Sequence, residues 1–307
     1  MKVHKLPYKN ILNSNIKYFA KSGRDCFDFI FKTYLCKTKK ILMPSYIGQT
    51  KKEGSGVFDP VRKNKLLFDF YQLDEKLQIK FKNLEKKVKL GNVQAIFIIH
   101  YFGFFQKKML EISLLCKKHN LILIEDFCHT LFPPKEVNYK SDFKIFSIHK
   151  TLNTKNGAYF TSNELFNHKK RTYVNSSNIN LKSLNTFINS NLLKIKNIRR
   201  NNYLFYYSEL RNIKFISIFE PNLCGQEVPL NFPILVKNEF REKLYFYLIS
   251  QGIESCAMWY ELIPEIRRDK YSSSFSISKS ILNLSNHQDI GKREILYTVT
   301  KIKDFFN

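Results

Sequence analysis

The stretch VQAIFIIHYFGFFQKKMLEISLLCKKHNLILIEDFCH, residues 93–129, decides the fold class of this chain. It begins with a nearly continuous apolar run, residues 93–99, of the kind that forms a parallel strand covered on both faces. A helical stretch follows at 107–120, and a second apolar run comes at 121–124. A strand, a helix and a strand in this order predict a βαβ unit, and therefore an α/β protein with a mainly parallel sheet.

Similar elements lie on both sides of this unit. In SGRDCFDFIFKTYL, residues 22–35, the apolar side chains have the spacing of one helix face, and Ser22 is a suitable cap. Short apolar runs predict strands at 41–43, 66–70, 142–148 and 158–161. We expect these elements to form a large domain over residues 1–200.

The second part of the chain has a different pattern. Residues 165–202 are polar and predict a connecting helix with an exposed segment. Beyond them, helices are expected at 203–210, 240–251 and 293–306, and a strand at 233–236. These elements predict a smaller C-terminal α+β domain over residues 201–307.

The composition limits the classes of function. The chain has 307 residues with a net charge of +25, and 44% of them are hydrophobic, so it is no disordered polyelectrolyte. The charge raises the alternative of a protein that binds nucleic acid or an anionic surface. The abundance of Lys, Asn, Ile, Phe and Tyr and the presence of only four alanines instead favour a codon bias towards A and T.

Cysteine spacing and hydropathy suggest a soluble cytoplasmic protein. The six cysteines form no CxxC pair, which argues against a zinc ribbon or a disulfide framework and predicts no metal site. The N-terminal residues MKVHKLPYKNILNSNI lack the apolar core of a signal peptide. The longest apolar run, residues 95–105, is well short of the ~20 residues that a membrane-spanning helix needs.

Three positions could carry chemistry. Glu125 and Asp126 come directly after a buried strand, at the edge of the sheet where ligands bind. Lys150 follows another strand and could act as a nucleophile towards an aldehyde. Gly23 precedes a helix whose first amides could hold a phosphate. Each signal is common by itself, but a phosphate site, an aspartate and a lysine in this order are what an enzyme that uses pyridoxal 5'-phosphate (PLP) needs.

The sequence resembles the DegT/DnrJ/EryC1/StrS family of sugar aminotransferases, which have the fold type I of PLP-dependent transferases. The similarity covers almost the whole chain and rests on the order of many short matches. These are SGRDCFDF (22–29), LMPSYI (42–47), FDFYQLDEKLQI (68–79), AIFIIHYFGFFQ (95–106), LILIEDFCHTLF (121–132), DFKIFSIHKT (142–151), VPLNFPILV (228–236), QGIESCAMWYELIP (251–264) and ILNLSNHQDI (281–290).

The resemblance implies a role for each matching residue. Lys150 would bond to the cofactor aldehyde and later move a proton, and Asp126 would pair with the pyridine nitrogen. His129 would lie beside the cofactor. Ser147 and the backbone amides of Arg24 and Asp25 would bind its phosphate. Tyr46 is a candidate for an aromatic side chain against the ring, and Trp259 and Tyr260 either line a sugar site or pack the small domain.

The chain also departs from the family pattern. The segment Ser147-Ile148-His149-Lys150 is two residues shorter than usual, so Lys155 remains a second candidate for the reactive lysine. A G-Y-N-x-R segment, which in the family reaches the site of the partner subunit, is missing after residue 160. A PLP-binding paralogue with weak activity is therefore an alternative, whereas a sugar dehydratase of this family would lack Lys150.

The resemblance thus implies a PLP-dependent aminotransferase that acts on a nucleotide-linked keto-sugar for cell-surface polysaccharide or other amino-sugar synthesis. Glutamate is the expected amino donor, and a homodimer is the expected assembly. No nucleic-acid or membrane partner is expected.

Overall fold

The computed structural model describes residues 16–134, 137–163, 173–174 and 179–307. The expectation about a signal peptide concerns residues that lie, except for Ile16, outside these ranges. Part of the polar stretch at 165–202 also lies outside them.

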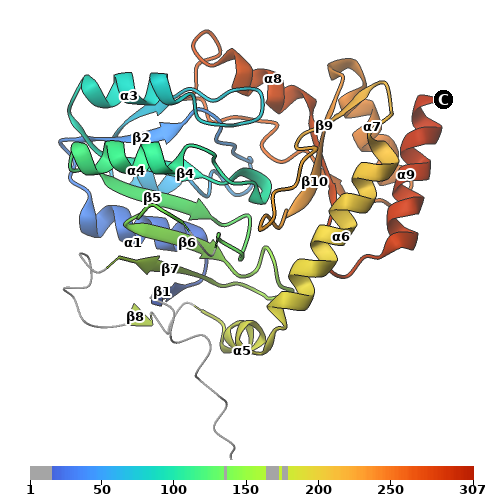
Figure 1. Cartoon of the computed structure of the whole chain (residues 1–307), viewed down its shortest axis with the longest axis horizontal. Coiled ribbons are helices and arrows are strands. Elements are labelled where there is room, and N and C mark those ends of the chain that lie inside the picture. Colours follow the sequence, from blue (N-terminus) through green and yellow to red (C-terminus); the bar gives the residue numbers. More distant parts are fainter. Residues whose placement is uncertain (1–15, 135–136, 164–172, 175–178) are drawn as a thin grey trace, which may run out of the picture.

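The larger of two sheets has eight strands in the order β3-β2-β4-β5-β6-β7-β1-β8 (Figure 1). In chain order these strands are β1 (Ile16–Ala20), β2 (Lys40–Pro44), β3 (Leu67–Tyr71), β4 (Val93–Ile99), β5 (Ile122–Phe127), β6 (Phe143–Ser147), β7 (Ala158–Ser162) and β8 (Tyr173–Val174). Strands β2 to β6 are parallel, and β7 runs antiparallel to both β6 and β1. The predicted α/β class with a mainly parallel sheet is confirmed.

Helices cover both faces of this sheet. Figure 1 shows α3 (Phe81–Lys89) and α4 (Met109–Lys118) in front of it and α1 (Gly23–Tyr34) behind it. Helix α1 forms where the apolar spacing predicted it, with Ser22 as its cap, and buries Phe27, Ile30 and Phe31. A short helix, α2 (Asp59–Lys63), packs against α1. Because β4 lies between layers of helices, all its residues from Ala95 to Ile99 are buried.

The second sheet has four antiparallel strands in the order β11-β12-β10-β9. Its strands are β9 (Ile216–Ile218), β10 (Asn231–Val236), β11 (Ser255–Cys256) and β12 (Ile281–Ser285). The remaining helices are α5 (Leu181–Asn189), α6 (Leu192–Leu210), α7 (Asn238–Ser250), α8 (Ser272–Ser280) and α9 (Lys292–Phe306). The sequence predicted β10, α7 and α9 within two residues of their ends.

Several details differ from the expectations. Helix α6 starts at Leu192 rather than at residue 203, and it runs through the proposed domain boundary at residue 200. Glu125 and Asp126 belong to strand β5 and do not follow it. A 3-10 turn, η2 (Tyr101–Gly103), follows β4 and was not predicted. No helix of the described ranges has the length and apolar character to cross a bilayer.

Candidate active site

A cavity of about 730 Å³ lies at the edge of the large sheet where the parallel strands end. Topology explains its place, because the carboxyl ends of β5 and β6 meet the start of α1 at this edge. Its walls contain six of the seven predicted site residues, which are Arg24, Asp25, Asp126, His129, Ser147 and Lys150.

Lys150 and Asp126 line the same cavity from the ends of neighbouring strands. Burial raises the pKa of Asp126, and the positive charge of Lys150 and the amide of Cys128 oppose this effect. The amide of Cys128 donates to Oδ1 of Asp126 over 2.7 Å, which fixes the carboxylate in place. Both candidate lysines are exposed, but Lys150 lines the cavity and Lys155 does not.

The N-terminus of α1 forms another wall. The amide of Asp25 is bonded within the cap, 3.1 Å from the carbonyl oxygen of Ser22. The amides of Gly23 and Arg24 are the first of the helix and have no acceptor within it. A Cβ atom on Gly23 would lie 2.7 Å from Sγ of Cys128, so the helix start and the end of β5 are in close contact. The Arg24 guanidinium turns to the carbonyl of Glu53 and to Asp59.

Ser147 ends β6 and is 1% exposed. Its Oγ lies 3.2 Å from Nδ1 of His149, and that nitrogen is also 3.3 Å from the carbonyl oxygen of Gly157. Burial lowers the pKa of His149, with a smaller effect from Lys150. A neutral His149 and the hydroxyl of Ser147 therefore lie beside the start of α1 in the cavity wall.

His129 is buried in the cavity wall, and its Nδ1 accepts a hydrogen bond from the amide of Phe102 over 3.0 Å. Burial lowers its pKa well below the ordinary value, and the charge of Lys150 acts in the same direction. A neutral imidazole that accepts at Nδ1 carries its proton on Nε2. No hydrogen bond recorded for the described residues uses this Nε2–H, so it is available as a donor to a ligand.

Tyr46 does not line the cavity. It is fully buried, and its hydroxyl donates to the carbonyl of Met258 over 3.2 Å. Trp259 stands in the wall instead, with ring centroids 5.7 Å from Tyr46 and 5.5 Å from His129. Tyr46 therefore does not hold the predicted place, and the aromatic side chain in the wall is Trp259, a candidate for a sugar site, from a segment more than 200 residues later in the chain.

The sequence did not single out several residues of this region. Arg199 is 3% exposed and donates to the carbonyl of Thr151, to that of Leu230 and to Gln288 Oε1. Because Thr151 follows Lys150 directly, this guanidinium holds the loop that carries the lysine. In the sequence Arg199 belongs to a basic pair, which is more often a solvated surface, so its burial was not foreseen. The loop at 48–57 also lines the cavity without a recognisable motif.

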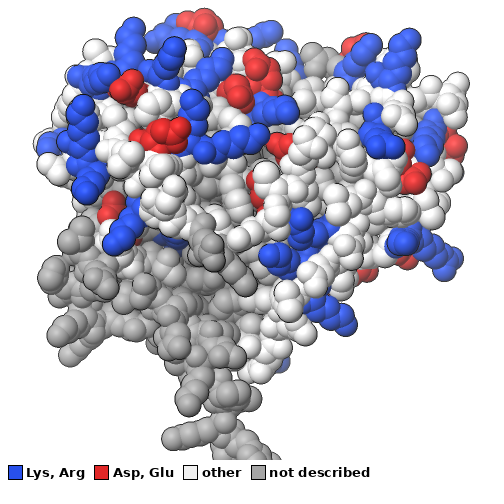
Figure 2. Space-filling view, viewed as in Figure 1, with Lys and Arg blue, Asp and Glu red and all other residues white. Residues whose placement is uncertain are grey.

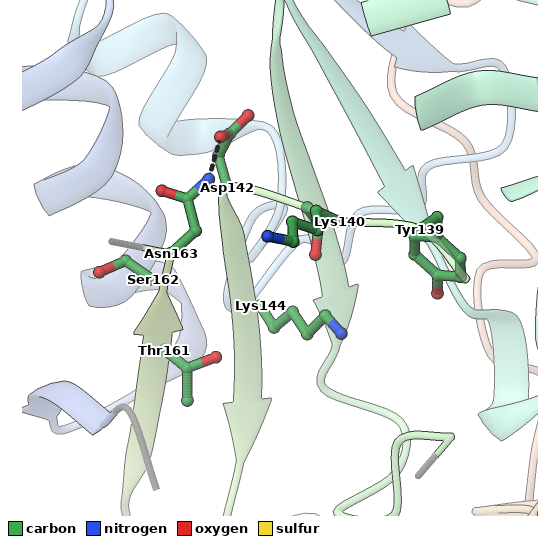
Figure 3. A pocket seen from close by; sticks show the side chains of 8 residues that line it. Tyr139, Lys140, Asp142, Lys144, Thr161, Ser162 and Asn163 are labelled. Carbon is green, nitrogen blue, oxygen red and sulfur yellow. Dashed lines mark hydrogen bonds between the residues drawn. The ribbon is translucent and has the colours of Figure 1, made fainter. Parts of the chain in front are cut away.

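A second, smaller cavity of about 200 Å³ lies at the opposite edge of the sheet, where β6 begins and β7 ends. Figure 3 shows the side chains around it, with Asn163 Nδ2 donating to Asp142 Oδ1 over 2.5 Å. None of the predicted site residues lines this cavity. Within the described ranges, no group of three or more His, Cys, Asp or Glu side chains could hold a metal ion.

The surface charge is spread rather than focused. Figure 2 shows Lys and Arg in several separate groups on the visible face, with Asp and Glu between them. Some are paired, such as Lys87 with Asp69 at 2.7 Å and Lys89 with Glu85 at 2.9 Å. This face does not have the single basic stripe that a nucleic-acid-binding protein would present.

Sequence comparison decides the family. The profile of the DegT/DnrJ/EryC1/StrS aminotransferase family matches residues 70–303. The chain belongs to this family. It is therefore a PLP-dependent aminotransferase, as the resemblance implied. No curated protein matches the sequence of this aminotransferase.

Solved structures share the fold of this aminotransferase. The aminotransferase TlmJ from Streptoalloteichus hindustanus aligns with a TM-score of 0.76 at 13% identity, over 94% of this chain and 85% of that one. Helicobacter pylori PseC, an aminotransferase involved in the biosynthesis of pseudoaminic acid, gives 0.74 at 16%, over 94% and 86%. The E. coli GDP-4-keto-6-deoxy-D-mannose-3-dehydratase, with bound hydrated PLP, gives 0.68 at 16%, over 92% and 86%. At these identities the comparison shows the fold alone, and it confirms the fold type I expectation.

Proposed function

We propose that this aminotransferase moves an amino group, with glutamate as the donor, to the keto group of a nucleotide-linked sugar, and that it binds PLP in the cavity of about 730 Å³. The observation that carries the proposal is that Lys150, Asp126, His129 and the start of α1 line this one cavity, whereas Lys155 does not.

The residues of the cavity suit PLP in three respects. The free amides of Gly23 and Arg24 at the positive end of α1 suit a phosphate, and the hydroxyl of Ser147 is a further donor. The contact between Gly23 and Cys128 leaves no space for a Cβ atom, so the backbone itself forms that wall. A buried carboxylate at Asp126 suits a protonated ring nitrogen, since an opposite charge would offset the cost of its burial.

When bound, PLP supplies an aldehyde that accepts an amino group and a ring that withdraws electrons. The chain then has four tasks. Lys150 Nζ would hold the aldehyde carbon until the donor amine displaces it, and as a free amine it would then move a proton at the reacting carbon of the substrate. Asp126 would keep a proton on the pyridine nitrogen, and His129 would donate its Nε2–H to an oxygen of the ring. The first amides of α1 hold the phosphate in register with these groups.

The nucleotide-sugar substrate is supported by the rim of the cavity. Lys21 and Lys52 are exposed there and would attract a diphosphate, while Trp259 offers an apolar face to a sugar ring. Structures of the same fold include an aminotransferase of pseudoaminic acid biosynthesis and a sugar aminotransferase, which supports a sugar as the amino acceptor. We further propose that the enzyme works in the cytoplasm, where its six free cysteines would stay reduced, and as a homodimer.

Borohydride reduction in the presence of PLP tests the assignment of the lysine. We expect the reduced cofactor on the peptide that contains Lys150 in the wild type and in Lys155→Ala, and no label in Lys150→Ala. Amino transfer from glutamate to a nucleotide-linked 4-keto-sugar, followed by mass spectrometry of the product, then tests the substrate class. A label on Lys155, or no gain of visible absorbance with PLP, would contradict the proposed site.

A further inference from the structure

The turn after β4, residues 100–106, hydrogen-bonds to two buried histidines in the same way. Its Phe102 amide donates to Nδ1 of His129 over 3.0 Å, and its Gln106 amide donates to Nδ1 of His100 over 3.2 Å. A neutral imidazole that accepts at Nδ1 must carry its proton on Nε2. Two backbone amides of one turn therefore fix the same tautomer in both rings.

The Nε2–H of His100 donates a hydrogen bond to a carboxylate on the face of the large sheet opposite to Asp126. Glu125 and Asp126 are successive residues of β5, so their side chains point to opposite faces. Nε2 of His100 lies 2.9 Å from Oε2 of Glu125, and both side chains are 0% exposed. His100 therefore cannot turn its ring over without leaving a buried carboxylate short of a donor.

Two further groups support Glu125. The hydroxyl of Tyr139 donates to Oε2 over 3.1 Å, and Nζ of Lys144 lies 4.0 Å from Oε1; Figure 3 shows both side chains. Burial acts to raise the pKa of Glu125, but the hydrogen bond from His100, together with the charge of Lys144, brings it below the ordinary value. Glu125 is thus ionised, and its carboxylate fixes the orientation of the His100 ring by accepting a hydrogen bond from Nε2.

The turn itself has little freedom. Phe102 has φ of 56°, a left-handed conformation that is uncommon outside glycine. Gly103 has φ of 94°, and a Cβ atom there would lie 2.7 Å from the carbonyl oxygen of Val228. The amide of Leu230 donates to the carbonyl of Phe102 over 2.7 Å. The direction of the Phe102 amide therefore depends on the whole turn and not on Phe102 alone.

We propose that His100 and Glu125, neither of which lines the cavity, are positioning residues that hold the 100–106 turn so that the Phe102 amide keeps the proton of His129 on Nε2, facing the cavity. If the turn relaxed, His129 could carry its proton on Nδ1, and Nε2 would become an acceptor that repels an oxygen of the ligand. The consequence for PLP binding rests on the proposed function, whereas the tautomer is a property of the protein without cofactor.

Nuclear magnetic resonance of the cofactor-free protein labelled with ¹⁵N-histidine tests the proposal. The chain has seven histidines, so the resonances of His129 can be assigned from their loss in His129→Gln. We expect the pattern of an Nε2–H imidazole for His129 in the wild type. His100→Phe keeps an aromatic ring against Phe127 but removes both nitrogens, and it should give His129 a substantial Nδ1–H population.

Two variants serve as controls. Glu125→Gln keeps an oxygen that accepts from His100, so it should preserve the wild-type tautomer, whereas Glu125→Leu should not. Tyr139→Phe removes a hydrogen bond to the same carboxylate oxygen and leaves the bond from His100 intact, so it should also leave His129 unchanged. Circular dichroism and the thermal midpoint check the folding of each variant, and Glu125→Leu replaces His100→Phe if the latter does not fold.

Titration with PLP then connects the tautomer with binding. His100→Phe should weaken the affinity on the order of ten-fold, and Glu125→Gln should change it little. An Nδ1–H tautomer of His129 in the wild type overturns the proposal, and so does a folded His100→Phe that keeps both the tautomer and the affinity. A wild-type protein with the expected tautomer but no affinity for PLP would instead refute the proposed function.

Discussion

Trp259 lies so close to Gly48 that a Cβ atom on Gly48 would be 2.3 Å from the indole ring. The backbone at Trp259 is left-handed, with φ of 62°, which turns the side chain from the C-terminal part of the chain towards His129. Glycine at position 48 and an unusual backbone at position 259 together create one wall of the cavity.

The fluorescence of Trp259 should therefore report on the cavity. It is the single tryptophan of the chain, so its emission has no background from other sites. We expect PLP to quench this emission, because a bound ring would lie within reach of the indole. Gly48→Ala displaces the indole and should shift the emission before any ligand is added. Saturable quenching in wild type and none in Lys150→Ala at the same PLP concentration would agree with the site; unchanged emission in the wild type would contradict it.

Gly23→Ala should perturb the phosphate end of the cavity through one contact. The added methyl group meets Sγ of Cys128 at 2.7 Å, and overpacking of this kind costs on the order of 1–3 kcal/mol. Cys128→Ala removes the sulfur and should restore much of the stability when combined with Gly23→Ala. Urea unfolding of the two single variants and the double variant measures this coupling. If the stability changes of the two single variants simply add in the double variant, the contact with Cys128 is not what excludes a side chain at position 23.

Asp126→Asn should make the cofactor-free protein more stable at neutral pH and less able to bind PLP. Because burial raises the pKa of Asp126 against the opposing charge of Lys150, the folded protein binds this proton more tightly than the unfolded chain. Stability from this group is therefore present at acid pH and is lost as the pH rises through the raised pKa. Asparagine keeps an oxygen for the Cys128 amide and removes the charge, which should add on the order of 1 kcal/mol at neutral pH.

Unfolding in urea at several pH values measures this effect. The difference in stability between Asp126→Asn and the wild type should be largest above the raised pKa and should shrink in acid. A difference that is independent of pH would contradict this account of Asp126.

Arg199→Met should loosen the loop that carries Lys150. The guanidinium donates to Thr151 and Leu230, and burial lowers its pKa to about 10. Methionine fills part of the space but removes the guanidinium donor of the Leu230 carbonyl, at a cost of about 1–3 kcal/mol, and leaves the Thr151 carbonyl with Gln288 as its donor. Hydrogen exchange should become faster at residues 148–157. Its neighbour Arg200, which donates to the carbonyls of Cys224 and Glu227, provides the control Arg200→Met. Equal exchange in both variants would refute the role of Arg199.

Local pattern was sufficient to predict the parts of the fold that bury a continuous apolar face. Strand β4 and helix α1 appear where the apolar spacing placed them, because each covers the core along its whole length. The position of Asp126 inside β5 was not predictable from hydropathy, since Glu125 and Asp126 end the apolar run while the backbone continues to pair with β6.

The candidate site also contains some residues that the sequence predicts and others that it does not. Asp126, Ser147 and Lys150 follow from strand ends and a family motif, and the cavity contains all three. Trp259 was one of two aromatic candidates for a sugar site, but its place beside the cavity depends on a left-handed backbone, and Arg199 acts through a buried charge; a single sequence reveals neither of these features. Choosing Trp259 over Tyr46 required knowing which aromatic faces the cavity and which packs behind it.

The segment around Trp259 is joined to the loop that follows β2 by backbone pairing. Gln49 donates from its amide to the carbonyl of Glu261, and Ile263 donates to that of Ile47, each over 3.0 Å. A fragment that ended after α6 would keep Lys150 and Asp126 but lose this wall, leaving an open groove. A ligand bound between the part of the chain up to α6 and the segment around Trp259 would oppose the separation of these two parts. Loss of the cofactor and the start of unfolding should therefore occur together in this enzyme.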